Sequence, residues 1–327
     1  MDKPGKKGAN PLENKKNRTR ELVGQFKIVL IFLAMCIILT ILKPTFFSVS
    51  NIINVLRQIS IIAIISMGST MIIISGGIDL SPGSIAGVTG IIAAMLSSSG
   101  MPAIVPVLAG LLAGALCGLF NGAIIAKGNI PPFIVTLGMM TIGRGLAYVL
   151  SDGKPISGLS SSFLVLGRSS VMGIPVPIII MVLAVLLTWM VMDKRVFGKH
   201  VYALGGNENA ARVSGVNVDL VKIKVYVFAG LMAGLGGVVL ASRIATGHPN
   251  SGNGYEMDAI ASTVIGGTSL SGGVGTIGGT VVGALIIGVL NNGLDLLGVS
   301  AYYQQIAKGL IIIAAVLMDQ KTKSKTN

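Results

Sequence analysis

The sequence predicts an all-α protein, a bundle of helices that crosses a membrane about ten times. Only 11% of the 327 residues are charged and 52% are hydrophobic, whereas soluble domains carry about 25% charged residues. The mean hydropathy is +0.82. The 45 glycines are roughly twice the usual share, and glycine lets helices pack closely in lipid. This composition excludes a nucleic-acid-binding domain, a disordered chain and a secreted disulfide scaffold.

The chain begins with a polar, basic segment, residues 1–26, which we expect to be a cytoplasmic tail. We interpret the apolar run after it as a retained first span rather than a cleaved signal peptide, because no small-residue cleavage site follows. A spanning helix needs about 20 apolar residues. The third and eighth candidate spans are short and interrupted by glycine, so a count of eight or nine stays open. The ten candidates are 27–43, 52–75, 83–98, 103–126, 131–150, 174–192, 223–245, 257–270, 274–297 and 302–318.

Basic residues are concentrated in a few polar segments. Eighteen of the 25 Lys and Arg residues lie in or beside the N-terminal tail, the loop 127–130, the segment 193–222 and the C-terminal tail 319–327. Cytoplasmic loops of membrane proteins carry an excess of these residues. Ten spans with both termini in the cytoplasm account for the distribution. The sequence therefore predicts a transmembrane domain over 27–318, with 193–222 as a cytoplasmic segment inside it.

Glycine patterns predict how the spans pack. Gly110, Gly114, Gly118 and Gly122 recur every four residues and form one face of the fourth span, typical of close helix contacts. The segment Gly76–Gly83 also matches a later stretch, residues 266–273, at five of eight positions, and both interrupt an apolar run. Broken helices at equivalent places in two halves often mark a transport site. A chance match in a Gly- and Ser-rich chain is the alternative.

No motif of an enzyme active site is evident. The phosphate-binding pattern G-x-x-x-x-G-K-[ST] is absent, since the Gly-Lys pairs at 153–154 and 198–199 precede Pro and His. Residues 273–278 match the dinucleotide pattern G-x-G-x-x-G, but no strand precedes them. His200 and His248 lack metal-ligand spacing. We therefore expect no catalytic residues, no cofactor and no metal site, and an intramembrane enzyme is the least supported class.

Polar residues at membrane depth are the candidates for a transport pathway. A charge at the bilayer centre costs roughly 2.5–3.5 kcal/mol, so such residues face a cavity or a partner. Asp79, followed by Ser81, lies at a helix break, where freed backbone amides could hold its carboxylate. Asn291, Asn292 and Asp295 have the spacing of one helix face and could bond hydroxyl groups. The alternatives are a structural cap at Asp79 and interhelical hydrogen bonds at the others.

The predicted cytoplasmic segment contains a short capped helix between Gly206 and Gly215. Asn207 is a good N-cap, and the glycine at 215 fits the position after the helix. Glu208 suits the positive end of the helix dipole and Arg212 the negative end. A helix of two turns outside the membrane has little core to justify it. We therefore expect it to dock on a cytoplasmic partner, with an ordinary loop helix as the alternative.

The stretch Tyr202–Gly215 resembles the coupling segment of bacterial monosaccharide ABC importer permeases, the ribose type above all. The resemblance covers about residues 40–320, and its blocks are specific to the family while they identify the sugar only weakly. Further blocks that agree with the family are Gly77–Ser81, Ala126–Gly128, Phe133–Gly138, Arg144–Gly145, Gly254–Ala261, Gly266–Leu270 and Leu290–Gln304.

The resemblance implies a permease subunit with a type II-like importer fold in the bacterial plasma membrane. Two copies would form the pathway, ABC ATPase subunits would dock on the cytoplasmic side, and a periplasmic or lipid-anchored binding protein would deliver the sugar. The expected activity is ATP-driven import of a pentose, with ribose foremost. The coupling residues would be Gly206, Asn207, Glu208, Ala210, Ala211, Arg212 and Gly215.

The residues themselves agree with this implication. A chain without a phosphate-binding loop must draw energy from another subunit. Only 5% of residues are aromatic, whereas tight sugar sites use aromatic faces with polar groups, so specificity would lie on another protein. The alternative function is a proton- or sodium-coupled secondary transporter that uses Asp79 and Asp258.

Overall fold

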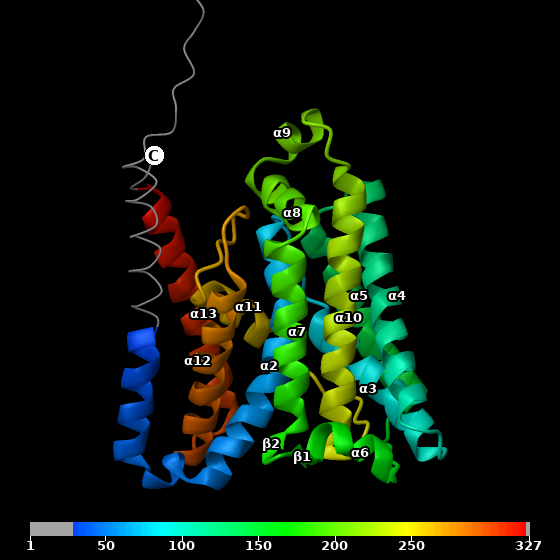
Figure 1. Cartoon of the computed structure of the whole chain (residues 1–327), viewed down its shortest axis with the longest axis vertical. Coiled ribbons are helices and arrows are strands. Elements are labelled where there is room, and N and C mark those ends of the chain that lie inside the picture. Colours follow the sequence, from blue (N-terminus) through cyan, green and yellow to red (C-terminus); the bar gives the residue numbers. More distant parts are fainter. Residues whose placement is uncertain (1–28, 325–327) are drawn as a thin grey trace, which may run out of the picture.

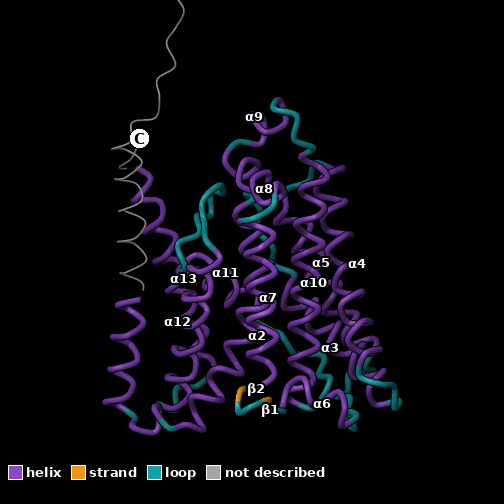
Figure 2. Tube along the Cα trace, in the orientation of Figure 1, coloured by secondary structure: helices purple, strands orange, loops and turns teal. Residues whose placement is uncertain are grey.

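The computed structural model describes residues 29–324, and this part of the chain is almost entirely helical (Figures 1 and 2). The predicted tail 1–26 lies outside the described residues. A small antiparallel hairpin pairs β1 (Ser170–Val171) with β2 (Ile174–Pro175). The helices are Val29–Leu42, the 3-10 helix η1 (Pro44–Phe47), α2 (Val49–Ile74), α3 (Pro82–Ser98), α4 (Ile104–Gly128), α5 (Pro132–Leu150), α6 (Ser161–Arg168), α7 (Val176–Asp193), α8 (Val196–Gly206), α9 (Glu208–Val213), α10 (Val218–Ile244), α11 (Tyr255–Ile265), α12 (Ile277–Leu296) and α13 (Ala301–Ser324).

Each of the ten predicted spans contains a helix, so the predicted fold class is confirmed. Among the described residues, six helices are long and apolar enough to cross a membrane: α2, α4, α5, α7, α10 and α12. The eighth candidate span gives only the eleven residues of α11, because the chain turns at Gly266 and Gly267, and Gly267 has a φ of +91°. The last predicted span extends into the predicted C-terminal tail, since α13 continues to Ser324.

Helix α10 is the centre of the bundle and packs against α2, α3 and α4. The predicted glycine face of α4, at Gly110, Gly114, Gly118 and Gly122, meets α10 directly. An added Cβ on Gly114 would lie 2.9 Å from the Cα of Gly234, and one on Gly118 would lie 2.9 Å from a backbone carbonyl carbon of α10. Side chains do not tolerate such distances to backbone atoms. The seam therefore requires glycine on α4, and the predicted close contact is confirmed.

The two segments of the internal echo are both helix breaks. Helix α2 ends at Ile74 and the next helix begins at Pro82, while α11 ends at Ile265 and α12 begins at Ile277. The breaks touch, because the backbone N–H of Gly273 donates a 2.8 Å hydrogen bond to the carbonyl of Ile74. Similar sequence in the two halves thus corresponds to similar local structure at one place in the bundle.

The segment between α7 and α10 projects from one end of the bundle, with α9 at its tip, and the last described turns of α13 lie toward the same end (Figure 1). The sequence did not predict α8, α6 or the β1–β2 hairpin. The predicted helix over 206–215 is shorter than expected: Gly206 is the last residue of α8, and the extended backbone of Asn207 (φ −163°) separates the two helices. Helix α10 begins earlier than predicted, because the side chain of Asn217 caps a charged first turn.

Candidate functional site

Helix α9 is short, but both of its ends are satisfied by hydrogen bonds. The side-chain oxygen of Asn207 accepts a 2.9 Å hydrogen bond from the backbone N–H of Ala210, as an N-cap does. At the other end, the N–H of Gly215 donates to the carbonyl of Arg212 and the N–H of Val216 to that of Ala211, each at 3.1 Å. This pattern is a Schellman motif, and it requires the left-handed backbone of Gly215 (φ +87°). The predicted caps are therefore confirmed.

Ion pairs fix α9 to the start of α10. The Oε1 atom of Glu208 accepts hydrogen bonds from Lys222, at 2.8 Å, and from Arg212, at 3.3 Å. Arg212 also donates to Asp219 at 3.2 Å. Partial burial raises the pKa of Glu208, but the hydrogen bonds and charges of Lys222 and Arg212 lower it by more, so its pKa lies below the usual value. These contacts hold a helix of six residues in a defined orientation.

One side of α9 packs inward and the other faces outward. Ala211 is buried, whereas Val213 is 90% exposed at the tip of the molecule. A side chain added at Gly206 or Gly215 would point into open space, since its Cβ would meet no atom within 4 Å. A rigidly held helix with a bare outer face is suited to contact a second protein.

The structure brings Asp79 and Ser81 together in the break between α2 and α3. The Oδ1 atom of Asp79 accepts hydrogen bonds from the backbone N–H of Ser81, at 2.7 Å, and from its hydroxyl, at 2.6 Å. The side-chain amide of Asn121, on α4, donates to the Ser81 hydroxyl at 3.1 Å. All three residues are buried. A freed backbone amide holds the carboxylate, as expected from the sequence.

The candidates on α12 point to different partners. Asn291 is buried, and its amide nitrogen lies 3.5 Å from the carboxylate of Asp258. Asn292 exchanges hydrogen bonds of 2.9 and 3.0 Å with Asn51. Asp295 accepts a 2.7 Å hydrogen bond from Gln304.

These α12 contacts lie on α11, α2 and α13, whereas Asp79 and Ser81 contact α4. The described residues therefore contain two separate polar groups, one at the α2–α3 break and one around α12. The two groups share no hydrogen bond that the structure describes. Whether both line a pathway stays a prediction.

Sequence reasoning missed Asn121, which completes one of these groups, and placed Lys308 at membrane depth without identifying its partner. Asn121 is fully buried on the glycine face of α4, between Gly118 and Gly122. A polar residue on a face that otherwise carries glycine was a usable signal. Lys308 on α13 lies 2.8 Å from Asp258, and its side chain is only 21% exposed. A lysine within an apolar stretch requires a partner, but the sequence does not indicate which acid supplies it.

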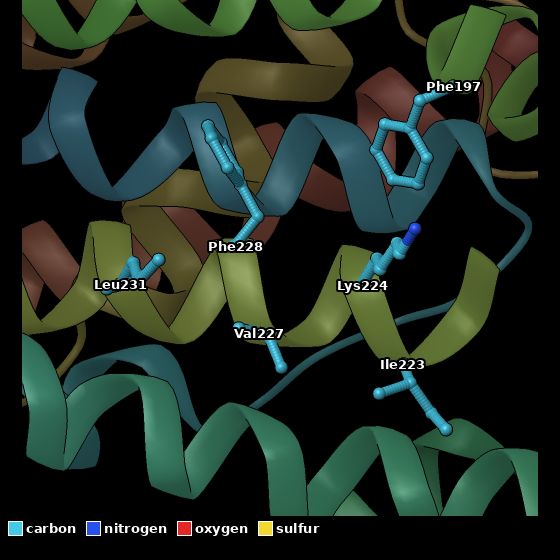
Figure 3. A pocket seen from close by; sticks show the side chains of 6 residues that line it. All are labelled: Phe197, Ile223, Lys224, Val227, Phe228 and Leu231. Atoms are coloured by element: carbon cyan, nitrogen blue, oxygen red, sulfur yellow. The ribbon is translucent and has the colours of Figure 1, made fainter. Parts of the chain in front are cut away.

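A hollow of about 330 Å³ lies between α8 and α10, and its lining contains none of these candidates (Figure 3). Its lining is apolar except for Lys224. Among the described residues, no group of three or more His, Cys, Asp or Glu side chains could hold a metal ion. The remaining lining residues are Phe197, Ile223, Val227, Phe228 and Leu231.

The broken membrane helices and the projecting capped helix are features of a multi-pass transport protein. The chain belongs to the family described as the permease component of branched-chain amino acid transport systems, whose model matches residues 51–316. It is therefore a transport component of the bacterial inner membrane rather than an enzyme. The resemblance seen in the sequence is confirmed at the level of the family.

Several curated relatives are similar over nearly the full chain. The ribose import permease protein of Bacillus subtilis is 48% identical over 88% of this chain and 90% of its own length. The ribose import permease protein of Escherichia coli K12 is 43% identical over 93% of this chain and 96% of its own length. The D-allose transport system permease protein of the same strain is 40% identical over 91% of each chain. No solved structure matches the chain.

Proposed function

We propose that this chain is the permease subunit of an ATP-binding-cassette importer that moves ribose across the inner membrane. The ribose import permeases are 43–48% identical to it, whereas the D-allose permease protein is 40% identical. These identities favour ribose among the sugars that such permeases carry. The alternative of a proton- or sodium-coupled carrier is not favoured, because the family consists of permease components.

The proposed coupling to an ATPase rests on one observation, the rigid and outward-facing helix α9. It is capped at both ends, fixed to α10 through Glu208 and Lys222, and bare on its outer side at Val213. A partner ATPase that binds this helix can move it as a rigid body, because its own hydrogen bonds do not have to break. The residues that we assign to this coupling are Gly206, Asn207, Glu208, Ala210, Ala211, Arg212 and Gly215.

The remaining subunits follow from this role. The chain supplies the membrane pathway, with a second copy of itself completing it, and a sugar-binding protein delivers ribose at the end opposite α9. In this arrangement the basic segments 1–26, 193–222 and 319–327 and both termini face the cytoplasm, and 27–318 forms the permease domain. The bias of basic residues toward these segments supports the orientation.

We assign Asp79, Ser81, Asn291, Asn292 and Asp295 to the translocation pathway. A sugar carries several hydroxyl groups, each of which donates and accepts hydrogen bonds. Side chains that already exchange hydrogen bonds between helices can exchange them with a passing hydroxyl when the helices separate. The support for this assignment is that all five residues hydrogen-bond at helix breaks or between helices.

Sugar uptake by proteoliposomes that contain the chain, its ATPase and the sugar-binding protein tests the coupling. We expect Glu208→Lys, which places a positive charge beside Lys222, and Gly215→Trp, which forces a side chain into a left-handed backbone, to abolish uptake. Both variants should still insert into the membrane. Lys154→Glu, a charge reversal in an exposed loop, is the matched control and should transport normally. Normal ATP-coupled uptake by Glu208→Lys and Gly215→Trp would refute the assignment of α9.

A further inference from the structure

Three parts of the chain that are far apart in the sequence meet at one point. They are the end of α2 at Ile74 and Gly76, the end of α8 at Gly205, and the α11–α12 loop at Gly272 and Gly273. An added Cβ on Gly205 would lie 2.6 Å from the backbone nitrogen of Gly273 and 2.9 Å from the carbonyl carbon of Ile74. We call these five residues the glycine junction. Figure 1 shows the loop before α12 rising beside the upper end of α2, on the side of the bundle that carries α8.

The contacts in the glycine junction join backbone to backbone. An added Cβ on Gly272 would lie 2.7 Å from the carbonyl oxygen of Gly205 and 3.0 Å from the Cα of Gly76. Gly272 and Gly273 also have left-handed backbones, with φ of +81° and +73°. No flexible side chain lies between the three segments to absorb a displacement. Because close-packed interiors are hardly compressible, a movement of α8 is passed directly to the other two segments.

Two further hydrogen bonds extend the glycine junction toward α9. The hydroxyl of Tyr202, on α8, donates to the carbonyl of Gly275 at 2.9 Å. The backbone N–H of Asn207, the N-cap of α9, donates to the carbonyl of Ala203 at 3.0 Å. One residue, Asn207, thus separates α8 from α9, and α8 contacts the α11–α12 loop at two places, through Gly205 and Tyr202.

Both helix breaks pass through the glycine junction. The break after α2 runs from it through Gly76 to Asp79 and Ser81, and the break before α12 includes Gly272 and Gly273. Gly76 from one break and Gly272 and Gly273 from the other thus both meet the end of α8 with no side chain between them. Static packing alone would not require the two breaks and the end of α8 to share one contact.

We propose that the glycine junction is the positioning element that transmits movement of α8 and α9 to both helix breaks. The inference rests on the proposed coupling role of α9 and extends it into the membrane. When α9 is displaced, Gly205 pushes on Ile74 and Gly273 together, and the two breaks shift as one unit. Asp79 and Ser81, a few residues beyond Gly76, would then change position in step with the start of α12.

The variant Gly205→Ala tests this role. Its added methyl group meets only backbone atoms, so Ile74 and Gly273 must move away from α8. We expect sugar uptake to fall at least about tenfold, equivalent to about 1.4 kcal/mol, while the ATPase still co-purifies and still hydrolyses ATP. Gly278→Ala, at the start of α12, is the matched control, because its Cβ meets no atom within 4 Å. It should transport at the wild-type rate.

The outcomes separate this inference from the proposed function. If the wild-type complex takes up no ribose, the proposed function fails. If the wild type transports and an assembled Gly205→Ala complex transports equally well, the glycine junction fails as a transmission element while the proposed function stands. If Gly205→Ala does not insert, Tyr202→Phe removes only the hydrogen bond to Gly275, and unchanged uptake by that variant counts against the inference.

A distance measurement tests the movement without altering the glycine junction. Spin labels on Ala203 of α8 and Val274 of the α11–α12 loop occupy exposed positions away from the outer face of α9, and a label on Lys127 at the end of α4 serves as the reference. Cys36 and Cys117 are first replaced by alanine. When ATP binds the partner ATPase, we expect the Ala203–Val274 separation to stay constant while the Ala203–Lys127 separation changes. An equal change in both separations, or no change in either, overturns the inference.

Discussion

The ion pair between Asp258 and Lys308 joins α11 to α13 inside the bundle. The carboxylate of Asp258 is 4% exposed and lies 2.8 Å from the ammonium group of Lys308, whose side chain is 21% exposed. Asn291 lies 3.5 Å from the same carboxylate. Removing one partner of a buried pair leaves a charge without compensation, which costs about 3–5 kcal/mol. Because Lys308 keeps some access to solvent, we expect the lower end of that range.

A double-mutant cycle measures this contribution. Lys308→Met and Asp258→Asn should each lower the thermal stability of the purified chain, and Lys308→Met should cost about 3 kcal/mol. The double variant should recover most of the loss, because neutral side chains of similar size leave no buried charge. The exposed pair of Asp152 and Lys154, whose atoms are 3.5 Å apart, provides the matched control, and its coupling energy should be close to zero.

The assay is thermal unfolding in detergent, and the measured quantity is the fraction of protein that is still monodisperse after heating. If Lys308→Met is as stable as the wild type, or if the double variant is no more stable than either single variant, the pair does not have the buried role described. A structural role for Asp258 also bears on the rival function. A proton-coupled carrier needs a carboxylate that exchanges protons with water, and Asp258 is instead buried against Lys308.

Three further predictions concern the glycine seam and helix α9. Gly114→Ala should lower thermal stability by about 1–2 kcal/mol, because its methyl group overlaps backbone atoms of α10, whereas Gly138→Ala, with no atom within 4 Å, should not lower it. Asn207→Ala should cost α9 about 1 kcal/mol of capping energy, seen as faster amide exchange at α9 and weaker uptake. Burial raises the folded-state pKa of Glu208, but the hydrogen bonds and charges of Lys222 and Arg212 lower it by more, so the pKa lies below the ordinary value of 4.5. The stabilising effect of this ion pair is therefore complete above pH 4.5 and is lost as the pH falls through the lower folded-state pKa. Exchange of α9 amides, corrected for intrinsic rates, should then increase only at such acidic pH, and an increase already between about pH 5.5 and 7, one unit or more above the ordinary value, would count against this ion pair.

The positions of the membrane spans along the chain were predictable because they depend on local properties of the sequence. Length and hydropathy locate the spans, since a helix must satisfy its backbone within the bilayer whatever its neighbours are. The four-residue repeat of glycine predicts the face of α4 that packs on α10. The caps of α9 were also predictable, because Asn207 and Gly215 form hydrogen bonds with backbone groups that are three residues away in the sequence.

The polar contacts between helices were not predictable, because they depend on which helices become neighbours. Asn51 and Asn292 are 241 positions apart, and nothing local in either segment indicates the other. The spacing on α12 suggested one polar face, but neighbouring helices on several sides of α12 give its polar residues different partners. Helix α8 was missed because Lys199 and His200 interrupt its apolar residues and because it ends in two glycines, Gly205 and Gly206.

The central claim is that the chain is a membrane pathway that is driven through α9 by an ATPase on a separate subunit. Ribose uptake into proteoliposomes that contain the chain, its ATPase and its binding protein tests this claim most directly when the proton gradient is collapsed and ATP is maintained. We expect uptake to continue under those conditions and to stop when ATP is removed. Uptake that stops with the gradient, or that the chain supports without an ATPase, would contradict the account.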